Sequence, residues 1–161
     1  MRNQGHISQD VAFEELQQLY PNIQKMANTS FYDFKVPQSP LHLLIETKWC
    51  NCHFWSVDIL LPWTQAHKLL EYKYYRLYIR TNRGHFFVTP ETVFEYSHVH
   101  RMSWNHNVKY LLLKFTRDMD NNFEPNIKQQ CTTCKGLLKD NLEYFMKDTH
   151  YTNITKRIFK I

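Results

Sequence analysis

Four cysteines are the residues whose type and spacing are best suited to chemistry. Two of them stand in residues 49–55, which read WCNCHFW, and the other two are Cys131 and Cys134. Structural zinc sites take four thiolate or imidazole ligands in a tetrahedron, usually supplied as two closely spaced pairs. Cys131 and Cys134 have the separation of such a pair. The sequence therefore predicts one structural Zn²⁺ that joins the two segments.

The other half of this predicted site is less sharply defined by spacing. Cys50 and His53 are separated by two residues, whereas Cys50 and Cys52 are separated by only one. We expect Cys50, His53, Cys131 and Cys134 to be the ligands, with Cys52 in place of His53 as the alternative. Four protein ligands leave no position for water, so the predicted zinc is structural rather than catalytic. The competing interpretation is that Cys50 and Cys52 are small buried residues between tryptophans.

Two histidines separated by one residue form a second candidate centre. His98 and His100 would lie on one face of a strand, where two imidazoles can hold a divalent ion. Downstream, Tyr144 and Lys147 match the Tyr-x-x-Lys pattern of rolling-circle replication nucleases. This alternative is a metal-dependent DNA endonuclease with Tyr144 as the nucleophile. The competing interpretation is that the histidines face solvent or a partner.

Residues 100–107, taken with Cys131 and Cys134, also faintly resemble the HNH nucleases, in which one His activates water. Val99 stands where an acidic residue or a His is expected before His100. The chain has only 3 Gly, so it contains no glycine-rich phosphate loop. We therefore favour a protein that is not an enzyme and has no small-molecule substrate.

Basic and aromatic residues alternate between residues 73 and 83. The predicted nucleic-acid contacts are Lys73, Arg76, Arg80 and Arg83, interleaved with Tyr74, Tyr75 and Tyr78. Lys and Arg would neutralise phosphate while Tyr stacks on bases. The net charge of +5 and the pI near 9.0 are compatible with binding to a polyanion such as nucleic acid. The alternative is that the tyrosines belong to the core and the basic residues form a solvated face.

Length and composition predict one α+β domain over residues 1–161, with residues 1–7 flexible. The domain should have a small, mostly antiparallel sheet, several helices and the structural zinc site. Aromatic residues make up 16% of the chain and supply large apolar side chains for a core. The first residues have no apolar core typical of a signal peptide, and no apolar run is long enough to span a membrane. We expect a protein that is not secreted and works in the nucleus or cytoplasm.

Hydrophobic periodicity places the expected elements along the chain. Helices are predicted at residues 8–20, from 62 to about 72, from 89 and at 138–148, and strands at 41–46, 54–61, 76–80, 85–88 and 108–115. The 76–80 and 85–88 strands form a hairpin in the favoured interpretation, whereas the rival extends the preceding helix to residue 78. Residues 118–125 are predicted to be a polar loop.

The chain resembles the small accessory nonstructural nucleoprotein-like proteins of parvoviruses, of the bocavirus type. The resemblance covers about residues 48–150. It rests on Trp49-Cys50, Phe54-Trp55-Ser56, Ile59, the aromatic-aliphatic strand at 110–115, and Cys131 and Cys134 leading into a helix. The chain lacks the long Arg/Ser-rich N-terminal region of that family.

The resemblance implies a nuclear, non-enzymatic viral protein that supports genome replication and regulates the processing of viral pre-mRNA. The implied partners are nucleic acid, RNA or DNA, and host RNA-processing or replication proteins.

Overall fold

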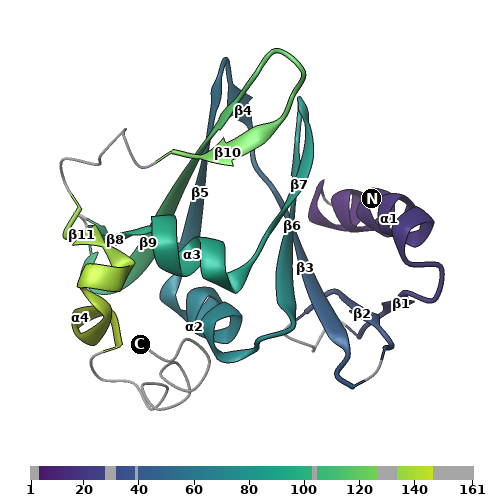
Figure 1. Cartoon of the computed structure of the whole chain (residues 1–161), viewed down its shortest axis with the longest axis horizontal. Coiled ribbons are helices and arrows are strands. Elements are labelled where there is room, and N and C mark those ends of the chain that lie inside the picture. Colours follow the sequence, from purple (N-terminus) through teal and green to yellow (C-terminus); the bar gives the residue numbers. More distant parts are fainter. Residues whose placement is uncertain (1–3, 28–31, 39, 103–104, 127–133, 147–161) are drawn as a thin grey trace. The chain divides into compact units, whose positions relative to one another are not determined.

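The computed structural model describes residues 4–27, 32–38, 40–102, 105–126 and 134–146 (Figure 1). It confirms the α+β class, with four α-helices and both parallel and antiparallel strand pairs in that part of the chain. Two compact units are present. Unit 1 comprises Met1–Asn51 and Tyr74–Thr89, and unit 2 comprises Cys52–Lys73 and Pro90–Ile161. The single domain over residues 1–161 stays a prediction.

Unit 1 contains a five-stranded sheet and one long helix. In chain order its elements are α1 (Gln4–Leu19), β1 (Gln24–Lys25), β2 (Phe34–Val36), β3 (Leu43–Trp49), β6 (Tyr75–Thr81) and β7 (Gly84–Val88). The strand order is β1-β2-β3-β6-β7, and only β3 and β6 run parallel. A parallel pair needs a long crossover connection, and here the chain between the two strands passes through Cys52–Lys73 of unit 2.

The core of unit 1 lies between α1 and one face of its sheet. Ala12 and Leu16 lie one helical turn apart on α1, and both are fully buried. They belong to one cluster with alternate strand residues such as Phe34, Ile45 and Tyr78. Because successive strand residues point to opposite faces, Tyr78 faces this cluster while its neighbours on β6 face the other side.

Unit 2 is built on an antiparallel sheet with helices on its apolar face. Its elements are β4 (Cys52–His53), β5 (Ser56–Pro62), α2 (Trp63–Glu71), α3 (Pro90–Tyr96), β8 (His98–Met102), β9 (Asn105–Arg117), β10 (Phe123–Pro125), β11 (Gly136–Leu137), the 3₁₀ helix η1 (Leu138–Asp140) and α4 (Leu142–Met146). The strand order is β11-β8-β9-β5-β4, and β10 pairs with the end of β9.

The pairing of β5 with β9 supplies the core of unit 2. Their register places Ile59 opposite Leu113 and Leu61 opposite Leu111, and all four side chains are fully buried. The apolar face of α2 covers this pair, with Ala66, Leu69 and Leu70 fully buried. Period-two alternation on both strands therefore fixes the register, because a one-residue slip would expose every one of these side chains.

Several sequence predictions are confirmed. The β6–β7 hairpin is present, α2 begins at Trp63 after Pro62, and α3 begins at Pro90. The strand predicted at residues 108–115 is β9, which is longer at both ends. These elements carry local signals that tertiary packing does not override.

Other boundaries differ from the sequence predictions. The first helix begins at Gln4, four residues before the expected Ser8. The segment predicted as a polar loop ends in β10. The helix predicted over residues 138–148 is divided into η1 and α4 at Asn141, whose extended φ of −131° interrupts helical geometry. Residues 147–161, which include the end of that predicted helix, lie outside the described residues.

Candidate metal centre and predicted contact residues

The edge of the unit 2 sheet brings Cys134 next to β8. In β11, Gly136 pairs with Val99, and the Lys135 amide donates to the Val99 carbonyl at 2.8 Å. This pairing positions Cys134 beside His100, with 3.4 Å between the Cys134 Sγ and the His100 Nδ1. A thiol and an imidazole 34 residues apart in sequence are therefore adjacent.

The 3.4 Å separation suits two ligands of one zinc ion. Zinc bonds of about 2.3 Å to sulfur and about 2.0–2.1 Å to nitrogen at a tetrahedral angle put the two donor atoms about 3.5 Å apart. The same distance also suits a hydrogen bond between a thiol and an imidazole. Within the described ranges, no group of three or more His, Cys, Asp or Glu side chains forms a metal-binding cluster.

Packing of the following segment holds Cys134 in this place. Leu138 is fully buried, and its amide donates to the Ser97 carbonyl at 2.9 Å. Phe145 of α4 stacks on the buried His67 of α2, with ring centroids 5.1 Å apart. The segment from Cys134 to Phe145 is thus anchored to unit 2 by backbone pairing and by apolar contacts.

The predicted zinc ligands are distributed over both units. Cys50 is a buried residue of unit 1, while the exposed His53 and the half-buried Cys134 belong to unit 2. Burial raises the pKa of the Cys50 thiol, and the Lys48 ammonium opposes this shift only in part. Cys131 lies outside the described residues. The set Cys50, His53, Cys131 and Cys134 therefore stays a prediction.

Sequence reasoning assigned His100 to a nuclease and missed it as a neighbour of Cys134. The His98-Val99-His100 pattern was a usable signal, because it places an imidazole at every second position of a strand. The pairing of β8 with a two-residue strand has no comparable signal. His100 became a candidate ligand only through the fold.

The candidate nuclease residues do not form an accessible catalytic group. His98 is 4% exposed, and burial followed by the Lys114 charge lowers its pKa. The hydroxyl of Tyr144 is buried, and the Lys135 ammonium lies 5.3 Å from its ring centroid. A nucleophile must reach the phosphodiester, which a buried hydroxyl does not. Lys147 and the side chains of residues 101–109 lie outside the described residues.

The tyrosines of the predicted nucleic-acid surface are largely core residues. Tyr75 and Tyr78 are 0% and 1% exposed, so neither is available to stack on a base. Burial raises the pKa of both hydroxyls, and hydrogen bonds to Glu46 and Glu15 raise them further. For these two residues the alternative interpretation, a core role, is the correct one.

The basic residues that were predicted to contact nucleic acid differ in exposure and in their contacts. Lys73 and Arg83 are exposed, but Lys73 belongs to unit 2 and Arg83 to unit 1. Arg76 is half-buried and donates to the Tyr75 carbonyl at 2.8 Å. The four residues therefore do not lie on one continuous strand face, and their contact with nucleic acid stays a prediction.

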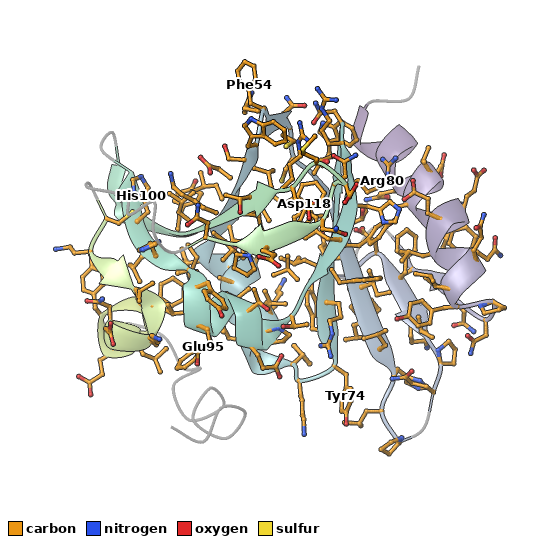
Figure 2. All side chains as sticks on the ribbon, turned by 45° about the horizontal axis from the view of Figure 1, so that its top comes forward. Phe54, Tyr74, Arg80, Glu95, His100 and Asp118 are labelled. Atoms are coloured by element: carbon orange, nitrogen blue, oxygen red, sulfur yellow. The ribbon has the colours of Figure 1, made fainter. Side chains whose placement is uncertain are left out.

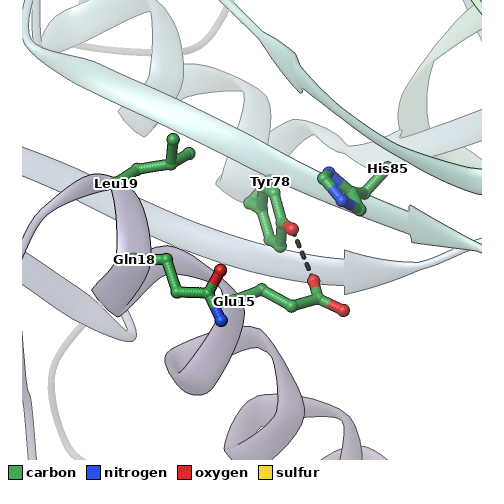
Figure 3. Close-up of a pocket in the computed structure, with 5 residues that line it drawn as sticks. All are labelled: Glu15, Gln18, Leu19, Tyr78 and His85. Atoms are coloured by element: carbon green, nitrogen blue, oxygen red, sulfur yellow. Dashed lines mark hydrogen bonds between the residues drawn. The ribbon is translucent and has the colours of Figure 1, made fainter.

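Arg80 is held by an internal ion pair. Its guanidinium donates to the Glu15 carboxylate at 3.2 and 3.3 Å and lies 5.4 Å from the Trp49 ring centroid. Tyr78 donates to the same carboxylate at 2.5 Å. This network borders a cavity of about 210 Å³, shown in Figure 3 and lined by Glu15, Gln18, Leu19, Tyr78 and His85.

The Glu15 carboxylate is the centre of that network. Burial acts to raise its pKa, but the hydrogen bonds from Tyr78 and Arg80, together with the Arg80 charge, outweigh burial and leave the pKa below 4.5. The charged form is thus the one that the folded unit stabilises.

No family model, curated protein or solved structure matches the chain. In the described part of the chain, no helix has the length and apolar character needed to cross a membrane.

We predict that Glu15→Gln lowers the free energy of unfolding by about 1–2 kcal/mol at neutral pH, because two donors lose a charged acceptor. The folded-state pKa of Glu15 is lowered, so its contribution is present above pH 4.5 and is lost as the pH falls through the folded value. Urea unfolding across this pH range measures the difference between variant and parent. Glu14→Gln, at the exposed neighbouring position, is the matched control and should have little effect. A Glu15→Gln difference that is constant with pH would contradict the assignment.

Proposed function

We propose that the chain is a non-enzymatic accessory protein of the viral regulatory class, stabilised by structural zinc and associated with nucleic acid or with proteins of RNA processing and genome replication. The observation that carries the zinc part is the 3.4 Å contact between the Cys134 Sγ and the His100 Nδ1. The class itself rests on the sequence resemblance.

A structural metal is consistent with the local architecture. β11 contributes only two residues to the sheet, so few ladder hydrogen bonds hold it to β8. A zinc ion bridging Cys134 and His100 would fix this edge covalently. Structural zinc commonly stabilises segments that are too short to be held by packing alone.

Including His100 changes the predicted ligand set. Zinc in a structural site accepts four protein ligands, and Cys131 remains a candidate from its spacing to Cys134. His100 would then take the place of His53, which pairs with Ser56 opposite Thr116 of β9, whereas His100 lies opposite Tyr110, six residues earlier on β9. Cys50 belongs to unit 1 and stays a predicted ligand.

A binding role is supported by charge and by the surroundings of the candidate catalytic groups. The net charge of +5 favours association with a polyanion, and Arg83 keeps an exposed position for it. The runner-up is the metal-dependent nuclease, which is favoured by the position of His98 and His100 on one strand. The buried hydroxyl of Tyr144 weighs against that alternative.

Metal analysis of the purified chain tests the zinc proposal. We expect one Zn²⁺ per chain in the parent and its loss in both Cys134→Ser and His100→Asn, because each removes a ligand that nothing replaces. His53→Asn is the matched histidine variant and should retain zinc. Full retention in Cys134→Ser would contradict the site. Loss in His53→Asn with retention in His100→Asn would restore the original ligand set.

A cleavage assay separates the two functions. Incubation with single-stranded DNA and Mn²⁺ or Mg²⁺ should leave the DNA intact, because the buried Tyr144 hydroxyl does not reach a phosphodiester. Tyr144→Phe removes only that hydroxyl and is the matched control. Cleavage by the parent that disappears in Tyr144→Phe would make the nuclease the leading function.

A further inference from the structure

The turn between β4 and β5 exposes two large aromatic side chains. Phe54 and Trp55 are the two turn residues, since His53 pairs with Ser56. Phe54 is 83% exposed and Trp55 is 54% exposed. Figure 2 shows Phe54 projecting beyond the ribbon. Large aromatic rings this exposed at a turn are unusual, because the hydrophobic effect favours their burial.

The backbone of this turn is strained at the aromatic residue itself. Phe54 has a φ of +56°, in the left-handed region that glycine adopts at little cost and a bulky side chain rarely adopts. Strained backbone persists where its surroundings hold it, and it is frequent at functional sites. A glycine would suit the turn better, so folding alone does not explain the phenylalanine.

Arg117, the last residue of β9, holds the turn in place. Its Nε donates to the Phe54 carbonyl at 2.6 Å, and its amide donates to the Trp55 carbonyl at 2.9 Å. Its guanidinium lies 4.4 Å from the Trp55 ring centroid. The Cys52 thiol also donates to the Phe54 carbonyl, at 3.7 Å. The aromatic pair is therefore presented in one fixed arrangement.

A second rigid loop presents another apolar side chain near the same arginine. Arg117 also donates to the Asn121 side-chain oxygen at 3.1 Å. The Asp118 carboxylate accepts the amides of Asp120 and Asn122, both at 2.9 Å, and so closes the loop. Between these residues Met119 is 85% exposed. Phe54, Trp55 and Met119 together are named the apolar tip.

We propose that the apolar tip docks into an apolar groove of a partner protein whose rim carries Lys and Arg. The charges beside the tip select this occupant. Asp118 and Asp120 flank Met119 and are exposed, and Glu124 is exposed on the adjoining strand β10. Hydrogen bonds from Asn122 and Asp120 lower the pKa of Asp118, so it is ionised at neutral pH.

The same carboxylates disfavour other occupants of the tip. Nucleic acid and anionic membranes would be repelled by Asp118 and Asp120 next to Met119. Arg117 adds one positive charge, which the three exposed carboxylates of Asp118, Asp120 and Glu124 outnumber. Preorganised aromatic anchors with a charged rim are typical of protein interfaces. This surface shares no residue with Cys134 and His100, the two candidate ligands that the fold brings together.

Selection of random peptides displayed on phage against the zinc-loaded full chain tests this proposal. Enriched peptides should carry a large apolar residue flanked by Lys or Arg, and their affinity should fall with added salt. In binding assays with the enriched peptides made synthetically, Phe54→Gly should raise the Kd by at least about tenfold. The same variant should keep or increase the thermal stability, because glycine relieves the positive φ.

Two further variants complete the experiment. Met119→Ser lies in an exposed loop and should also weaken binding without loss of stability. Leu19→Ser, at an exposed apolar position of unit 1, is the control and should leave the peptide Kd unchanged. Peptides that bind parent and Phe54→Gly equally would overturn the proposal. So would binding of oligothymidylate or of phosphatidylserine vesicles that depends on Phe54 while peptide binding does not.

Discussion

Strand β9 is the element on which unit 2 depends. It pairs with β5 along one edge and with β8 and then β10 along the other. Its alternating residues Leu111, Leu113 and Phe115 form the floor on which α2 packs. Because a slip of one residue would turn these side chains to the opposite face, the hydrophobic pattern of β9 fixes the register of its partners.

That register positions both candidate sites of the unit. His100 lies opposite Tyr110, and the apolar tip is held by Arg117 at the end of the same strand. Seven residues of extended chain separate these two points, which corresponds to about 23 Å. The proposed metal centre and the proposed docking surface are thus parts of one rigid strand system with separate chemistry. Loss of zinc is therefore expected to affect the β8–β11 edge, and loss of the apolar tip to affect the binding of a partner.

Local sequence signals were sufficient for most of the longer helices and strands, but not for the short strands or the sites. The alternation at residues 76–80 and the turn before Gly84 identified the β6–β7 hairpin, and Thr89-Pro90 identified the start of α3. The buried tyrosines were not distinguishable from stacking residues, because β6 is buried on both faces. Alternation of basic and aromatic residues does not reveal which face of a strand is covered.

The two candidate sites depend on contacts between distant residues. Cys134 approaches His100 through a two-residue strand that leaves no periodic pattern. The strain at Phe54 results from a two-residue turn whose sequence, Phe-Trp, has none of the usual turn residues. The predicted zinc site took residues 49–55 (WCNCHFW) as a single segment that carries metal ligands. In the fold it passes from unit 1 to unit 2 between Asn51 and Cys52, and its last aromatic residues are exposed at a turn.

X-ray absorption at the zinc K edge of the zinc-loaded chain tests whether Cys134 and His100 hold the metal, because it identifies the ligand atoms. We expect sulfur at about 2.3 Å and imidazole nitrogen at about 2.0–2.1 Å. The sulfur contribution should decrease in Cys134→Ser, and the imidazole contribution should decrease in His100→Asn. A spectrum with oxygen and nitrogen ligands only, or one that neither substitution alters, would contradict a metal centre at these residues.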